Sequence, residues 1–85
     1  MKQSIRTNQQ LGQLLIGRRK ALGLSQQQLG VKVGISQKRQ SGLEREPGRV
    51  TIDRLLGLLA ALGLELVVQD NGQVSRGDSS HKTEW

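Results

Sequence analysis

The chain has 85 residues, 34% of them hydrophobic, with a formal net charge of +6 and no cysteine. A chain of this length folds as one domain with a small core, so we expect oligomerisation to add stability. The absence of cysteine excludes disulfides and thiolate metal sites. The first residues lack the apolar run of a signal peptide, and no stretch approaches the ~20 apolar residues that cross a bilayer. We therefore expect a cytoplasmic protein.

Positive charge is concentrated in the first part of the sequence. Through Val50, ten Lys and Arg residues stand against Glu44 and Glu46, which gives +8. From Thr51 onward, three basic residues stand against five acidic ones, which gives −2. A basic surface favours contact with phosphates, as in proteins that bind nucleic acids. A solvated basic face without a partner is the alternative.

The first predicted helix spans about residues 8–22 and is capped by Thr7 or Asn8. Its apolar stripe is interrupted by Arg18. Either this side chain extends its charged end to solvent, or the stripe is rotated toward Leu14.

Residues 24–44 are the most informative stretch, because they predict two short helices joined by a tight turn. Ser25 is placed to cap the first helix, and Gln28 stands where a capping-box partner reaches back. Gly34 permits the left-handed conformation that ends a helix, and Ser36 supplies the next cap. This pattern is typical of a helix-turn-helix, which binds DNA. A solvated helical hairpin is the alternative.

The second helix of this pair carries polar side chains at or near its N-terminus. Their amide, cationic and hydroxyl groups are able to reach base edges or phosphates. The candidate DNA contacts there are Ser36, Gln37, Lys38, Arg39 and Ser41.

A last helix is predicted after the break at Pro47 and Gly48, with Thr51 as its cap and Gly63 at its end. We expect its buried face to consist of Ile52, Leu55, Leu56, Leu59 and Leu62, widened by Leu58.

Residues 64–70 follow with partial alternation of apolar and polar side chains, which predicts a β-strand. No other strand is predicted, and a lone strand leaves its backbone polar groups unpaired. Pairing with the same strand of a second subunit satisfies these groups and buries the row of Leu64, Leu66 and Val68. The predicted fold is therefore all-α: a compact four- to five-helix domain at residues 1–70, with one C-terminal β-strand that pairs across a homodimer.

Residues 71–85 form a polar tail with too few apolar groups to fold alone, so we expect it to be flexible. It ends in Trp85, the only aromatic residue of the chain. Either this residue is incidental, or it docks the flexible tail on a partner.

The run RKALGLSQQQLGVKVGISQKRQSGLEREPGRV resembles the Cro/C1-type (XRE-like) helix-turn-helix domain of phage repressors and bacterial regulators, over roughly residues 11–63. More closely, GLSQQQLG, LEREPGRV, ALGLELVV and the terminal Trp resemble HipB-type antitoxins, which repress their own toxin–antitoxin operon. The resemblance implies a C-terminal strand that forms an intersubunit β-lid. It also implies a palindromic DNA operator, a HipA-like kinase toxin as partner, and a place in the bacterial cytoplasm, at the nucleoid when bound to the operator.

The resemblance further implies roles for individual residues. Gln26 and Gln37 match phosphate- and base-contacting positions, and Arg19 and Glu44 match a structural ion pair between the first helix and the recognition helix. Recognition-helix positions are also matched by Lys38, Arg39 and Ser41.

Three residues depart from the family pattern. Gly30 replaces the usual Ala at a close helix crossing, and Gln40 replaces a usual apolar residue, so we expect a looser or rotated recognition helix. Gly42 stands where a longer polar side chain is common, which removes one possible contact.

We expect neither an enzyme nor a cofactor site. The run from Gly12 to Arg19 lacks the Lys-Ser/Thr pair of a phosphate loop, and His81 lies in the polar tail rather than on a rigid scaffold. We interpret the chain as a DNA-binding repressor and antitoxin. The alternatives are a stand-alone phage-type repressor, or an interaction module whose basic helical surface binds an acidic partner or a membrane surface.

Overall fold

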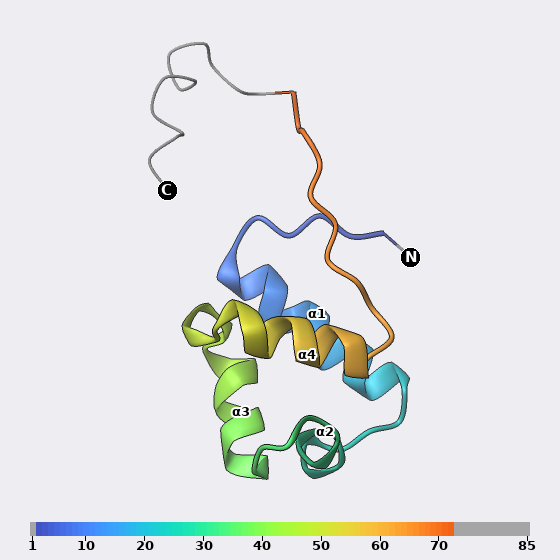
Figure 1. The fold of residues 1–85 in the computed structure, drawn as a ribbon, viewed down its shortest axis with the longest axis vertical. Coiled ribbons are helices and arrows are strands. Elements are labelled where there is room, and N and C mark those ends of the chain that lie inside the picture. The colour runs from blue at the N-terminus through green and yellow to red at the C-terminus, as the bar shows by residue number, and fades with distance from the viewer. Residues whose placement is uncertain (1, 73–85) are drawn as a thin grey trace.

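The computed structural model describes residues 2–72 of the chain. The elements are α1 (Asn8–Ala21), α2 (Gln26–Val33), α3 (Gln37–Arg45), the short 3-10 helix η1 (Pro47–Arg49) and α4 (Ile52–Ala61). Figure 1 shows α2 and α3 below α4 and the N-terminal segment above it. The predicted all-α helix-turn-helix fold is confirmed, and no strand is assigned within residues 2–72. No helix in this part of the chain has the length and apolar character of a membrane span.

Each α-helix begins at a hydroxyl residue whose side chain accepts a hydrogen bond from the backbone N–H three residues further on. These caps are Thr7, Ser25, Ser36 and Thr51. Gln28 accepts a hydrogen bond from the Ser25 N–H at 2.8 Å, which completes the predicted capping box. At α1 the cap is Thr7 rather than Asn8.

The turn between α2 and α3 depends on Gly34. This residue ends α2 with a φ of +79°, in the left-handed region that favours glycine. The Ile35 N–H then donates to the Gly30 carbonyl at 2.8 Å, and Ser36 caps α3 directly afterwards. The chain therefore changes direction within three residues, while the Gly34 and Ile35 N–H groups still donate to carbonyls of α2.

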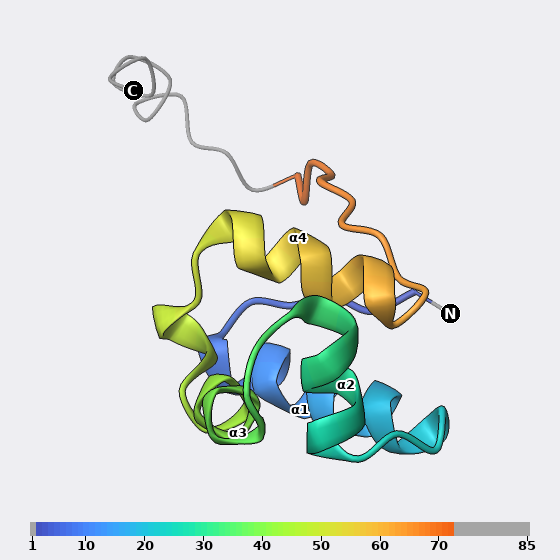
Figure 2. The ribbon, with the colours of Figure 1, turned by 60° about the horizontal axis from the view of Figure 1, so that its bottom comes forward.

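The core is formed by six leucines. Five of them lie in α1, α2 and α4, and the sixth, Leu62, is the C-cap of α4. The six are Leu15, Leu29, Leu55, Leu58, Leu59 and Leu62. In Figure 2, α4 lies across the other helices, and its closest partner is α2. The predicted buried face of α4 is wrong for Ile52 and Leu56, which are 60% and 45% exposed. This helix has more apolar positions than one packed face covers, and the covered stripe is centred on Leu58 and Leu59.

Two arginines bind the C-terminal carbonyls of helices other than their own. Arg18 Nε donates to the Leu62 carbonyl at 2.9 Å, at the end of α4. Arg54 Nη1 donates to the Val33 carbonyl at 3.0 Å, at the end of α2. A cation at this end satisfies a free carbonyl and complements the helix dipole. The interruption of the apolar stripe at Arg18 therefore has a structural role.

The backbone after α2 approaches that helix closely at Gly30, which is buried. A Cβ atom placed at Gly30 would lie 2.6 Å from the Ile35 carbonyl oxygen, closer than real Cβ atoms come. Gly30 therefore allows a closer approach here, in contrast to the looser packing that its departure from alanine predicted.

We expect Gly30→Ala to lower the free energy of unfolding by about 1–3 kcal/mol, because the atom in its way belongs to the backbone. Gly17→Ala is the matched control, since nothing lies within 4 Å of a Cβ at Gly17 in α1. That substitution should raise stability by about 0.5–1 kcal/mol. Urea unfolding measures both values, and a stabilising effect at Gly30 would contradict the close approach.

Candidate nucleic-acid interface

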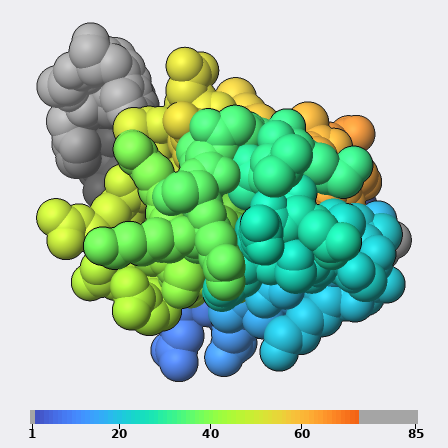
Figure 3. All heavy atoms as spheres, turned by 90° about the horizontal axis from the view of Figure 1, so that it is seen from below, coloured from blue at the N-terminus to red at the C-terminus, as the bar shows by residue number. Residues whose placement is uncertain are grey.

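The helices α2 and α3 lie side by side on one face of the molecule. Viewed from below in Figure 3, side chains of α3 project outward from this face. Gln37, Lys38 and Arg39 are exposed, whereas Ser41 is half-buried. Ser36 Oγ accepts from the Arg39 N–H at 3.2 Å, so its hydroxyl serves as the helix cap. The N-terminal end of α3 therefore presents one amide and two cations to solvent.

The charged residues of α3 divide between two faces of the helix. Lys38, Arg39 and Arg45 are exposed, whereas Glu44 is only 5% exposed and faces the interior. The acidic side chain is therefore removed from the surface, and the exposed charges of α3 are all positive. Such a surface suits contact with phosphates and guanine bases.

A buried ion pair fixes α3 on α1. Arg19 Nε lies 2.7 Å from Glu44 Oε2, and Arg19 Nη2 lies 3.2 Å from Glu44 Oε1. The two side chains are 10% and 3% exposed. Arg19 Nη1 also donates to the Leu24 carbonyl at 2.8 Å. One guanidinium therefore joins α1, the loop before α2, and α3 in a bidentate geometry of the strong kind.

Two glutamine amides complete the contacts of Glu44. Gln26 Nε2 donates to Glu44 Oε1 at 3.1 Å, and Gln40 Nε2 donates to Glu44 Oε2 at 3.0 Å. Gln26 is half-buried at the start of α2. One of its amide N–H groups is therefore engaged inside the protein, while its second N–H and its carbonyl oxygen are not used by this contact. Spacing along the sequence gave no signal for this link between α2 and α3.

The carboxyl of Glu44 has opposing influences on its pKa. Burial raises the pKa because it disfavours the charged form. Hydrogen bonds from Arg19, Gln40 and Gln26, together with the charge of Arg19, lower the pKa by more, so that it lies below its ordinary value. Glu44 is therefore ionised at neutral pH and balances the buried charge of Arg19.

Arg45 is a candidate contact that the sequence analysis did not include. Its Nη2 is the atom nearest to a Cβ placed at Gly42, at 4.0 Å. The guanidinium therefore lies beside the space that a longer side chain at Gly42 would fill. Gly42 and Arg45 are three residues apart, which places them on the same face of a helix, and this spacing was the signal in the sequence.

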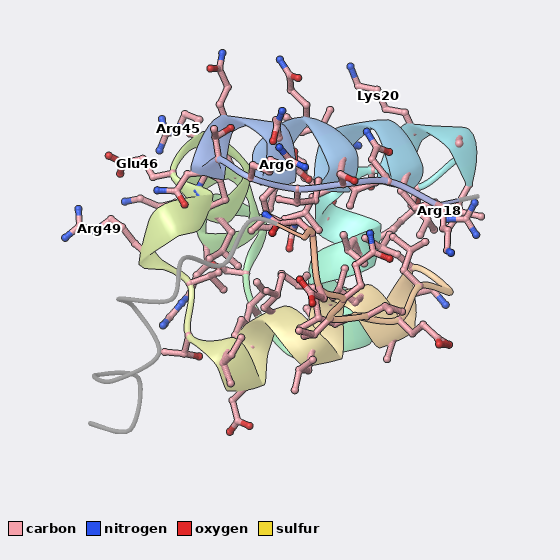
Figure 4. All side chains as sticks on the ribbon, turned by 90° about the horizontal axis from the view of Figure 1, so that it is seen from above. Arg6, Arg18, Lys20, Arg45, Glu46 and Arg49 are labelled. Carbon is pink, nitrogen blue, oxygen red and sulfur yellow. The ribbon has the colours of Figure 1, made fainter. Side chains whose placement is uncertain are left out.

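Charged side chains also gather at two places on α1: where α3 and η1 meet it, and at its far end. Figure 4 shows Arg45, Glu46 and Arg49 at the first place and Arg18 and Lys20 at the second. Arg49 Nη1 lies 3.8 Å from Glu46 Oε1, and both side chains are exposed, so this pair is weak.

The residues of the expected dimer strand follow α4. Leu64 packs against the core, whereas Leu66 is 52% and Val68 90% exposed. A strand that pairs only across a dimer axis is not assigned within one chain, so this strand stays a prediction. Trp85 lies outside the described residues. Within residues 2–72, no three His, Cys, Asp or Glu side chains gather as metal ligands.

A scan of protein-family models matches residues 15–69 to a family described as helix-turn-helix. Similar solved structures include a HipB-O1-O2 complex, at 29% identity and a TM-score of 0.74, with 81% of this chain and 100% of that chain covered. A HipA-HipB-O2-O3 complex matches at 28% identity and a TM-score of 0.75, with 82% of this chain and 99% of that chain covered. A HipB-O4 20mer complex matches at 28% identity with the same TM-score and coverage. A search of curated proteins gave no match.

We expect Glu44→Gln to lower the free energy of unfolding by about 3–5 kcal/mol at neutral pH, because it leaves the buried Arg19 charge without its partner. The folded-state pKa of Glu44 is below 4.5, its ordinary value. Its stabilising contribution is therefore complete above that value and is lost as the pH falls through the lower folded-state pKa. Urea unfolding at neutral and acidic pH should show this loss in the wild type but not in Glu44→Gln.

The matched control for this variant is Glu46→Gln, which removes an exposed carboxylate. It should change stability by no more than about 1 kcal/mol. Losses of the same size in both variants would contradict the assignment of the buried pair.

Proposed function

We propose that this chain, which belongs to the helix-turn-helix family, is a sequence-specific DNA-binding transcriptional repressor and the antitoxin of a HipBA-like operon. The observation that carries the proposal is the exposed N-terminal end of α3. There Gln37, Lys38 and Arg39 project from a helix that is fixed on α1 by a buried ion pair. In a helix-turn-helix, the second helix enters the major groove and its N-terminal residues contact base edges.

The residues of this surface have complementary roles in the proposal. The Gln37 amide suits a bidentate contact with adenine, and Lys38 and Arg39 suit guanine or a phosphate. Gln26 stands at the N-terminus of α2, where free backbone N–H groups and the helix dipole also favour a phosphate. Ser41 is the smaller contact, because its side chain is half-buried.

The antitoxin part of the proposal is supported by the likeness to HipB, which extends over 81% of this chain in one HipB complex. A structure that also contains HipA is similarly close. The proposed protein partner is therefore a HipA-like kinase toxin, with Trp85 as a contact. The chain has no catalytic role or cofactor in this proposal. Repression of an operon places it in the bacterial cytoplasm, at the nucleoid when it is bound to the operator.

The proposal includes a homodimer that pairs the strand containing Leu64, Leu66 and Val68. The exposure of Leu66 and Val68 in the single chain supports this arrangement, because a second subunit would cover them. A two-fold protein binds a palindromic operator.

A footprint of the full chain on the DNA upstream of its own reading frame tests the proposal. We expect protection of a palindrome with half-sites about one helical turn, roughly 34 Å, apart. On this operator, Gln37→Ala should cost about 1–3 kcal/mol and lower the preference over scrambled DNA, because one base contact is lost. Titration of both DNAs measures the preference.

The matched control is Gln13→Ala, which removes an exposed amide from α1 and should bind like the wild type. A wild-type chain that protects no upstream DNA refutes the repressor function and leaves the basic surface for another partner. A Gln37→Ala variant with wild-type preference would show that Gln37 makes no base contact.

Deletion of Trp85 tests the toxin partner. A buried Trp contributes about 150–250 Å² and often on the order of 2 kcal/mol to an interface, so toxin binding should weaken by that amount. Operator affinity should not change. Trp85 is the only Trp of the chain, so its fluorescence should shift to the blue when a toxin without Trp is added. His81→Ala in the same segment is the control, and unchanged affinity and fluorescence would show that Trp85 is incidental.

A further inference from the structure

Gln40 is a polar residue in the interior of the domain. Its side chain is 0% exposed, on the inner face of α3. Its Nε2 donates to Glu44 Oε2 at 3.0 Å. Its Oε1 is buried without a hydrogen-bond partner among the described residues. A buried carbonyl without a donor is unfavourable, since the group has lost its hydrogen bonds to water.

Packing alone does not explain an amide at this position. A Met side chain has similar length and no oxygen to leave unpaired, but it has no N–H group for the buried carboxylate of Glu44. What Gln40 supplies beyond volume is one directed N–H group. That group ends on the carboxylate of Glu44.

The carboxylate of Glu44 binds one glutamine amide on each of its oxygens. Gln40 donates to Oε2, and Gln26 donates to Oε1. Arg19 contacts both oxygens, through Nε and Nη2. The terminal torsion of a glutamate side chain is broad, so its plane is set by the donors around it. On Oε2, the oxygen that Gln26 does not contact, Gln40 acts together with Arg19 Nε.

We propose that Gln40 is a positioning residue for DNA recognition: by holding the plane of the Glu44 carboxylate, it fixes the direction in which Gln26 presents its carboxamide at the N-terminus of α2. This inference rests on the proposed function, because Gln26 is a DNA contact only if α2 and α3 meet DNA. Gln40 itself is buried and touches no DNA. Its effect passes through Glu44 to Gln26. This role explains why the position holds an amide even though the amide oxygen is left unpaired.

The experiment compares the full-length wild type with Gln40→Met on the footprinted operator and on scrambled DNA. We expect operator binding to weaken about threefold to tenfold, the range for one lost hydrogen bond. Scrambled DNA should be bound more weakly by a similar factor, because a phosphate contact of Gln26 carries no sequence information. The unfolding midpoint in urea should change little, because the loss of the hydrogen bond to Glu44 and the removal of the unpaired oxygen have opposite effects on stability. Gln13→Met, at an exposed site on α1, is the matched control.

A double-mutant cycle with Gln26→Ala separates positioning from a general structural role. If Gln40 acts through Gln26, Gln40→Met should have no further effect on operator affinity once Gln26 is truncated. An equal effect in both backgrounds would overturn the proposal. So would wild-type operator affinity in Gln40→Met. Gln40→Leu is a second apolar variant that should weaken operator binding by a similar factor, and wild-type operator binding in both variants would overturn the positioning role of Gln40.

The failure of this inference is distinguishable from the failure of the proposed function. A wild-type chain that binds no operator refutes both. If the wild-type chain binds its operator but the variants give one of the overturning results above, only the role of Gln40 is refuted.

Discussion

The bidentate pair of Arg19 and Glu44 is the interaction on which the rest of the structure depends. It is buried between α1 and α3, and Arg19 also holds the Leu24 carbonyl before α2. Two charges in an interior are costly to bury, and they are tolerated here because each of the three guanidinium nitrogens of Arg19 donates to an acceptor. The same pair removes the acidic charge of α3 from the surface. The attachment of the helix and the cationic character of its outer face therefore have one cause.

Arginine in this domain serves the fold as much as the surface. Arg18 and Arg54 each bind a carbonyl at the C-terminal end of another helix, and Arg19 forms the buried pair. With a core of six leucines, such contacts add links between helices that apolar packing alone does not supply. The charge count of the sequence therefore overstates the charge that is free for a nucleic acid. The exposed cations of α3, Lys38 and Arg39 among them, are the better measure of that surface.

Apolar side chains outside the core mark the faces on which one chain is incomplete. Ile52 and Leu56 lie on the outer side of α4, and Leu66 and Val68 follow that helix, all of them substantially exposed. A small domain seldom leaves so many large apolar groups in contact with water without a partner. The proposed dimer pairs the strand that contains Leu66 and Val68 and does not use the outer face of α3.

The sequence by itself determined the helices and their ends, because these depend on residues within three or four positions. The cap at Ser36 and the turn at Gly34 are local features, and both were predicted. Resemblance to a family, rather than any spacing, indicated the Arg19–Glu44 pair. Only the tertiary structure decided which side of α4 is buried, and that an amide of Gln26 binds Glu44, 18 residues away. Such contacts depend on how helices cross, and that geometry arises from the packing of the whole core rather than from any local pattern.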